Sequence, residues 1–509
     1  MRSQNTIKNS LVNTIGQVVM TVVHFFVRMI FIRKLGDVYQ SINGLFTNIL
    51  SMLSLAELGL DIAICYSLYK PLADKDENKI NQYMSLYKKI YRLIGFIVLA
   101  LGLIVMPFLK HLVGEEYMVK EIYIIFILFL AKSCVSYWLF SYRSTLIQAD
   151  QKKYKLQRFN YLFEFLSSML QVAVLILFKS FIGYLVIAIV FTICRNFFIG
   201  YYIKKLYPFI KNKPEGKLSS EEKKALFKNV YGASLFKVSG TIYNSSDSII
   251  IAASALSFVT VGYYSNYMLV FSSLTTLIAR LINSTSASIG NFNVTETIAR
   301  KKKLYNIISF ANFWIYGVIA ICCVALIDPF VSIFFTSRSV LDPLTVLLLI
   351  ANFVLGGLID AVILFKDACG LFYKGRFRPI LSTIFNVFFS ILLVKPLGLA
   401  GIILGTIISR ILSTFWYDPI LVYKYVFKRS LFDFYARYLF QFLFVCAVGT
   451  GFYFLAKLFT ITTIWSWILA GVCYFALANL VFLLCFFWTK EFKFIKNKVF
   501  SFLKIKKAE

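Results

Sequence analysis

The chain has 509 residues, of which 59% are hydrophobic, 18% aromatic and only 15% charged. A soluble protein typically carries about 25% charged residues, so this composition, with a mean hydropathy of +0.75, excludes an ordinary water-soluble enzyme. The net charge of +30 does not indicate a nucleic-acid partner, because the longest polar stretch, 204–229, is too short to form a basic domain.

Apolar runs of about 18 to 25 residues, separated by short basic stretches, predict an all-α polytopic membrane protein. The first run is too long for the core of a signal peptide and no small-residue cleavage site follows it, so we expect it to be retained. Nine cysteines without a C-x-x-C motif and only two histidines indicate neither a disulfide framework nor a metal site. We expect fourteen spans, near 12–32, 42–67, 93–110, 121–142, 161–179, 183–203, 230–254, 261–286, 305–327, 342–365, 379–394, 399–423, 438–458 and 465–488.

The positive charges predict the orientation of these spans. With the N-terminus in the cytoplasm, 40 of the 54 Lys and Arg residues fall in cytoplasmic segments and 8 in external loops. The excess of basic residues on one side is typical of the cytoplasmic face. We therefore expect a bacterial plasma-membrane protein with both termini, Lys88-Lys89 and Lys301-Lys302-Lys303 in the cytoplasm.

The long cytoplasmic loop 204–229 divides the first twelve spans into two sets of six. It contains Ser219 followed three residues later by Glu222, which predicts a capped helix start. A faint repeat supports two related lobes, since Arg195 and Arg410 each follow a glycine by twelve residues. The expected parts are an N-terminal lobe (1–203), the loop (204–229), a C-terminal lobe (230–424), two added spans (425–488) and a basic tail (489–509). The tail has apolar residues at helical spacing among lysines, which indicates either an amphipathic helix on anionic inner-leaflet lipids or a solvated tail.

Ionisable residues inside spans are costly in lipid, so they are the candidate functional residues. Cations and a histidine that would line a substrate cavity are Arg28, Lys237, Arg280 and His24. Acids that would gate or couple transport are Asp247, Glu57 and Asp61. Further cavity candidates are Asn244, Asn266, Lys132, Arg195 and Arg410.

Helical spacing and depth place these residues in two tiers. His24 and Arg28, like Glu57 and Asp61, are four residues apart and are expected to share a helix face. At 1.5 Å per residue, His24, Arg28, Asn244 and Asp247 belong to an outer tier. The inner tier comprises Glu57, Asp61, Lys237 and Arg280.

Each role has a structural alternative. Arg195 and Arg410 are expected to pair with acids or backbone carbonyls, and Glu164 and Asp360, near cytoplasmic ends, to be interfacial. Glu57 and Asp61 are open to a second interpretation, in which they only neutralise nearby cations.

Several sequence segments resemble the polysaccharide transporter family of Wzx-type flippases. The resemblance covers nearly the whole chain and rests on the number and order of the segments. They are residues 43–46 (NGLF), 51–60 (SMLSLAELGL), 66–76 (YSLYKPLADKD), 87–91 (YKKIY), 244–251 (NSSDSIII), 261–267 (VGYYSNY) and 287–291 (ASIGN).

This resemblance implies the fold of the multidrug/oligosaccharidyl-lipid/polysaccharide exporter superfamily, in which two six-helix lobes alternate between inward- and outward-open states. It also implies a polyprenyl-pyrophosphate-linked oligosaccharide as substrate, flipped outward for capsule, exopolysaccharide or O-antigen synthesis. Related flippases use a cavity arginine in their first helix, and Arg28 matches it. Polymerase and glycosyltransferases of the same pathway are the expected protein partners.

Other function classes remain as alternatives or are disfavoured. An ion-coupled small-molecule exporter of the same fold is the nearer alternative, and coupling to a proton or sodium gradient stays open. A membrane-embedded glycosyltransferase would need catalytic acids or a large external loop, and the external loops are short. The sequence shows no nucleotide-binding loop and no catalytic constellation, so we expect no enzyme activity and no cofactor.

Overall fold

The computed structural model describes residues 2–505, apart from 58, 284–288, 291, 293–295 and 372–373. Leu58 and three residues of the segment 287–291 therefore lie outside the described residues. The regular secondary structure of the described residues is helical, which confirms the predicted all-α class. The chain divides into two compact units, residues 1–265 and 266–509, and each is described by itself.

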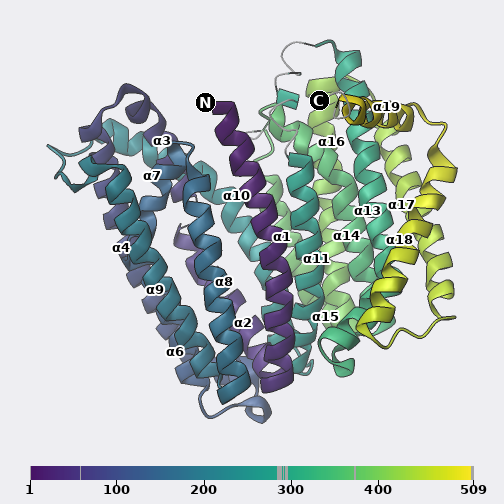
Figure 1. Cartoon of the computed structure of the whole chain (residues 1–509), viewed down its shortest axis with the longest axis horizontal. Helices are drawn as coiled ribbons and strands as arrows, with labels where there is room; N and C mark the ends of the chain where they lie inside the picture. The colour runs from purple at the N-terminus through teal and green to yellow at the C-terminus, as the bar shows by residue number, and fades with distance from the viewer. Residues whose placement is uncertain are drawn as a thin grey trace. The chain divides into compact units, whose positions relative to one another are not determined.

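The first unit is a bundle of long helices in which α1 packs along α8, α8 along α9, and α6 against both α4 and α9 (Figure 1). The helix α10 packs against α2 and α3 and is therefore grouped with this unit. The predicted lobes, 1–203 and 230–424, stay a prediction. The elements are α1 (Arg2–Leu35), α2 (Asp37–Leu53), η1 (Ser54–Glu57), α3 (Leu60–Asp74), α4 (Glu77–Val105), η2 (Met106–Phe108), α5 (Leu109–Val113), η3 (Glu115–Tyr117), α6 (Ile122–Trp138), η4 (Ser141–Arg143), α7 (Ser144–Ala149), α8 (Lys153–Phe178), α9 (Phe181–Leu206), η5 (Pro208–Lys211), α10 (Ser220–Ala253) and the start of α11 (Val259–Asn283).

The second unit is built around α13, which contacts α14, α17, α18 and α19. A layer of aromatic rings, including Phe313 and Phe482 with centroids 5.1 Å apart, joins α13 to α18. Besides the rest of α11, the elements are α13 (Ile298–Phe334), η6 (Ser337–Ser339), α14 (Pro343–Ala368), α15 (Arg378–Leu412), α16 (Thr414–Val422), η7 (Tyr423–Phe427), α17 (Phe432–Ala456), α18 (Ile464–Phe486) and α19 (Lys490–Ile505).

Among the described residues, nine helices are long and apolar enough to cross a membrane, or ten if the bent pair α6 and α7 forms one span. The protein is thus a polytopic membrane protein. Each of the fourteen predicted spans falls on a helix or a broken helix. The number of nine or ten is smaller than fourteen partly because the 50-residue stretch 378–427 is counted once, although it contains two predicted spans. The helices α2, α3, α10 and α11 are not among the nine, and three of them carry the polar candidates Asp61, Lys237, Asp247, Asn266 and Arg280.

The helix α15 is a hairpin of two helical arms that meet at Gly398. That residue has a φ of 58° and a ψ of −136°, a conformation open to glycine but strained for other residues. Beyond the corner the arms lie against each other, since Asn386 donates to Thr406 Oγ1 at 2.8 Å and Ser390 donates to the Ile402 carbonyl at 3.2 Å. The two predicted spans 379–394 and 399–423 therefore meet without an intervening loop.

The loop 204–229 is packed against the start of α4. Glu215 exchanges hydrogen bonds with Asn78, and Lys79 forms a 2.5 Å ion pair with Glu222, which lowers the pKa of that carboxyl group. Ser219 and Glu222 cap each other's backbone N–H groups, so the predicted capped helix start is confirmed. This cap fixes where α10 begins.

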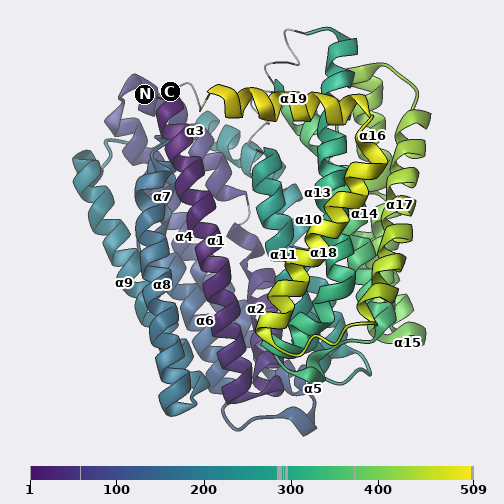
Figure 2. The same ribbon diagram turned by 45° about the vertical axis from the view of Figure 1, so that its right-hand side comes forward.

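The basic tail forms the helix α19, which lies across the ends of the long helices α13 and α18 (Figure 2). Phe492 stacks on Trp314 of α13 with centroids 5.5 Å apart, whereas Lys490, Lys493 and Lys496 are exposed. The helical part of the prediction is confirmed as far as Ile505, and binding to anionic lipids stays a prediction.

The orientation of the chain can be tested with single cysteines. Lys302 would be an unsuitable cytoplasmic reporter, because its side chain is only 7% exposed and would resist labelling from either side. In a variant without native cysteines, Lys303→Cys should resist a membrane-impermeant thiol reagent added to intact cells, and Glu116→Cys should react, since both positions are exposed. Labelling at position 303 in intact cells would overturn the predicted orientation.

Candidate functional site

The second predicted span is broken in the middle, at the position of its two acids. A short 3₁₀ turn, Ser54–Glu57, ends the first part, and α3 begins at Leu60 after Gly59, which has a φ of 92°. The expectation that Glu57 and Asp61 share one helix face is therefore wrong, because the spacing rule requires a continuous α-helix. The break gives the two carboxylates different partners.

Glu57 points toward aromatic residues of the first unit. Its carboxylate accepts a hydrogen bond from the Tyr91 hydroxyl of α4, whose ring lies 4.6 Å from the Tyr87 ring. Tyr87 in turn shares a 3.3 Å hydrogen bond with Thr145 of α7. Glu57 is thus the end of a buried hydroxyl network rather than a partner of Lys237.

Asp61 pairs with Lys237 across the contact between α3 and α10. Lys237 Nζ lies 2.7 Å from Asp61 Oδ1, and the two side chains are 35% and 36% exposed. An ion pair in which both side chains are about one-third exposed contributes only about 0–1 kcal/mol to the stability of the protein. It can therefore open at small cost when another anion approaches the lysine.

A seam of polar contacts continues along α2, α10 and the start of α11. Asn48 donates to Ser248 at 3.1 Å, and Ser41 receives a hydrogen bond from the backbone N–H of Gly262 at 3.0 Å. Asp247, which is 6% exposed, accepts a hydrogen bond from the Tyr264 hydroxyl at 2.8 Å. Asn244 is exposed on the same helix. Polar side chains and backbone groups therefore join these three helices.

Arg28 of α1 is oriented by the amide of Gln40 on α2. In the amide orientation that satisfies both groups, the Gln40 oxygen accepts from Arg28 Nε at 2.8 Å and from Nη1 at 3.0 Å. Gln40 is 1% exposed, and Arg28 is partly buried. Because the amide is neutral, this contact fixes the guanidinium without cancelling its charge.

His24, one turn before Arg28, contacts an acid to which sequence reasoning had assigned no partner. Its Nε2 lies 3.1 Å from Glu164 Oε1 on α8, and both side chains are more than 40% exposed. Glu164 also acts electrostatically on Lys132 of α6 and Arg195 of α9. Four of the first unit's helices thus contribute to one group of charges.

The contact between His24 and Glu164 differs from the predicted depths of these two residues. The sequence predicts His24 in the outer half of the first span and Glu164 close to a cytoplasmic end. In the structure the two groups are 3.1 Å apart and therefore lie at the same depth. Both helices begin before their predicted spans, α1 at Arg2 and α8 at Lys153, so the distance from the edge of an apolar run does not measure depth. The first part of α8 contains basic residues, so it is not part of the apolar run from which the span was predicted.

The second unit carries its own polar residues. Asp360 accepts a 2.6 Å hydrogen bond from the Tyr316 hydroxyl, and the charge of Arg410 acts on it. The pairing of Arg410 with an acid or a backbone carbonyl stays a prediction. Tyr267 donates to Asp328 at 2.7 Å, a partly buried contact that the sequence did not indicate. Asn266 is fully buried, and Arg280 is partly buried. The place of Arg280 in the inner tier stays a prediction.

The arrangement in the first unit suits binding and charge exchange rather than bond-making. Within the part of the chain that the structure describes, no three His, Cys, Asp or Glu side chains group as a metal site requires. The cations and acids lie instead on several helices, where a helix movement would change their partners.

Comparisons with known proteins establish the fold. No protein-family model matches the sequence, and no curated protein does. Among solved structures, the chain is similar to the inward closed conformation of the lipid II flippase MurJ, with a TM-score of 0.65, 14% identity, and coverage of 92% of this chain and 98% of that one.

Two further structures have the same fold. The inward-facing conformation of a multidrug resistance MATE family transporter of the MOP superfamily gives a TM-score of 0.59 at 14% identity, over 86% of this chain and 99% of that one. A MOP superfamily transporter from Pyrococcus furiosus, described as having a binding pocket of reversed polarity, gives 0.52 at 14% identity, over 84% and 97%. This chain has the fold of MOP-superfamily transporters.

Proposed function

We propose that this protein is a flippase that moves polyprenyl-pyrophosphate-linked oligosaccharide units from the cytoplasmic to the external leaflet. The units would serve capsule, exopolysaccharide or O-antigen synthesis in a bacterial plasma membrane, beside a polymerase and glycosyltransferases. Two lobes would alternate in opening to either side. The fold supports this proposal, because a lipid II flippase is among the solved structures that share it.

The Asp61–Lys237 pair is the observation that carries the proposal. A pyrophosphate is a dense anion that needs cations in a wet cavity, and Lys237 is held by a counter-ion that it can exchange. Arg28, oriented by Gln40, supplies a second cation with a planar donor set suited to phosphate oxygens. On arrival, the pyrophosphate would replace Asp61 as the partner of Lys237 and leave the acid free to take up a proton or cation.

Reconstitution tests the proposal directly. Proteoliposomes containing the purified protein should move a fluorescent polyprenyl-pyrophosphate oligosaccharide across the bilayer, measured by its accessibility to a membrane-impermeant quencher. The matched monophosphate lipid should move at least about tenfold more slowly, since it offers fewer oxygens for charge-assisted hydrogen bonds. Equal rates in protein-free liposomes would exclude flipping by this chain.

A second function, ion-coupled export of small molecules, is favoured by one observation. His24 and Glu164 form an accessible acid–base pair in the first unit, and MATE transporters share the fold. Histidine and acidic side chains form the proton relays of many membrane pumps and transporters.

If this second function holds, Glu164→Gln should abolish the proton-driven efflux of a fluorescent organic cation from proteoliposomes. The reason is that glutamine cannot exchange a proton. Glu116→Gln, an exposed acid between two helices, is the matched control and should leave efflux unchanged. A wild-type protein that flips lipid-linked oligosaccharide but exports no organic cation would contradict this function.

A further inference from the structure

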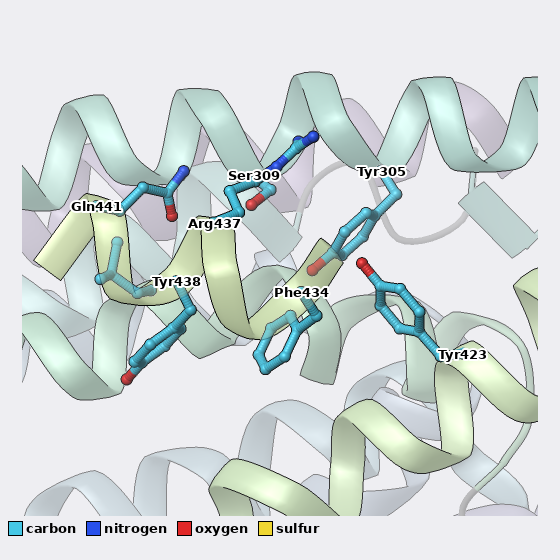
Figure 3. Close-up of a pocket in the computed structure, with 8 residues that line it drawn as sticks. Tyr305, Ser309, Tyr423, Phe434, Arg437, Tyr438 and Gln441 are labelled. Atoms are coloured by element: carbon cyan, nitrogen blue, oxygen red, sulfur yellow. The ribbon is translucent and has the colours of Figure 1, made fainter. Parts of the chain in front are cut away.

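A small polar cavity lies inside the second unit, where α13, α14, η7 and α17 meet (Figure 3). Tyr305 and Ser309 come from α13, Tyr423 from η7, and Arg437 and Gln441 from α17. The hydroxyl groups of Tyr305 and Tyr423 point toward each other across it (Figure 3). None of these side chains takes part in the proposed transport site.

A buried lysine contacts two of the tyrosines that line this cavity. Lys302 is only 7% exposed, and its ammonium group donates to the Tyr423 hydroxyl and lies 4.0 Å from that ring's centre and 4.9 Å from the centre of Tyr305. Asp433 acts on this ammonium group from a distance, and among the described residues no carboxylate forms an ion pair with it within 4.0 Å. Aromatic rings stabilise the cation in part, but a buried charge is usually paired with an opposite one.

A second cation lines the same cavity. Arg437 is partly buried, and its charge acts on Lys302, Tyr305 and Tyr423. The exposed Asp433, one turn earlier, acts on Lys302 and Tyr423, but among the described residues no acid forms an ion pair with Arg437 within 4.0 Å. The exposed Arg429 adds a further positive charge that acts on Lys302. The cavity therefore carries an excess of positive charge together with hydroxyl and amide groups that can donate hydrogen bonds.

We propose that this cavity binds the phosphate group of an anionic ligand. Phosphate oxygens are recognised by charged and neutral hydrogen-bond donors. Here these are the Arg437 guanidinium, the Tyr423 hydroxyl that accepts from the Lys302 ammonium, and the neutral groups around them. Because the cavity is small, one oxygen enters between the tyrosine hydroxyls and the rest of the group stays at its mouth beside Arg437. The ligand offsets the charge of the two cations.

The sequence places this cavity at the level of the inner-leaflet headgroups. Tyr305, Tyr423 and Arg437 lie at the cytoplasmic ends of the predicted spans 305–327, 399–423 and 438–458. A phosphate there comes from an anionic phospholipid or from a free phosphate in the cytoplasm. Both share the chemistry of the site, and an experiment with two probes separates them.

The test uses the delipidated full chain in detergent and in nanodiscs. In detergent, inorganic phosphate should raise the thermal unfolding midpoint in a saturable way, because a ligand that binds only the folded state stabilises it. In nanodiscs, native mass spectrometry should show phosphatidylglycerol retained in preference to phosphatidylcholine. Phosphate binding without retention of phosphatidylglycerol identifies free phosphate as the ligand, and retention identifies the lipid.

Arg437→Gln should weaken binding of the probe by about tenfold or more, the loss expected for one charge-assisted hydrogen bond. Arg338→Gln removes the same charge from an exposed position in η6, beyond the other end of α13, and should leave the affinity unchanged. Tyr423→Phe, which keeps the ring and removes one hydroxyl, should weaken binding by a smaller factor and serves if Arg437→Gln does not fold. Equal losses in Arg437→Gln and Arg338→Gln, or no saturable effect of either probe, would overturn the proposal.

Discussion

Replacing Arg28 by alanine should abolish polymer export while the protein still inserts into the membrane. Two charge-assisted hydrogen bonds to a pyrophosphate, at about 1.5 kcal/mol each, correspond to a loss of roughly 100-fold in transport rate. Arg28→Lys should restore export only in part, because an ammonium group cannot reproduce the guanidinium's contacts with Gln40. The measurement is surface polymer per unit of membrane-inserted protein.

Arg33→Ala is the matched control for Arg28, since it removes the same charge from an exposed position near the end of the same helix. Export should be close to wild type in this variant. Gln40→Leu tests the orientation of Arg28 separately and should reduce the rate without removing the cation. Normal polymer output from well-expressed Arg28→Ala would show that Arg28 does not hold the substrate.

Asp61→Asn should uncouple flipping from an imposed ion gradient and leave binding of lipid-linked oligosaccharide intact. Asparagine cannot take up a proton or hold a cation when the pyrophosphate occupies Lys237. Loss of the pair should cost only about 1 kcal/mol of stability at most, because both side chains are about one-third exposed. Flipping in proteoliposomes with and without a proton or sodium gradient measures the effect.

Two controls separate coupling from structure. Asp74→Asn changes an exposed acid at the other end of α3 and should keep the gradient dependence. Glu57→Gln should act differently from Asp61→Asn, since Glu57 contacts Tyr91 and not Lys237. Gradient-dependent flipping at the wild-type rate in Asp61→Asn would mean that the pair is only structural.

The spans could be predicted from the sequence because lipid demands long apolar helices whose backbone groups are satisfied internally. The two arms of α15 correspond to the separate predicted spans 379–394 and 399–423, and they meet at Gly398. The pairing of Asp61 with Lys237 agrees with their similar predicted depth. These predictions depend on one-dimensional properties, namely length, hydropathy and position along a helix.

Features that depend on a break or a tilt could not be predicted in this way. The separation of Glu57 from Asp61 follows from Gly59, whose positive φ the sequence permits but does not require. The partner of His24 was missed because the depth of Glu164 was counted from the edge of the apolar run, and the helix begins eight residues earlier. The sequence signal for this break is the glycine Gly59 between two acids, Glu57 and Asp61, in an otherwise apolar run.

The tight corner of α15 has a consequence for the biogenesis of the chain. A Cβ atom at Gly401 would lie 2.1 Å from the Leu393 carbonyl oxygen, so the arms are in backbone contact as soon as the chain has turned. We therefore expect the two arms to leave the insertion machinery as one helical hairpin, with the corner never exposed as a free loop. An epitope tag placed at this corner should block insertion, whereas the same tag between α17 and α18 should be tolerated and reach the outside.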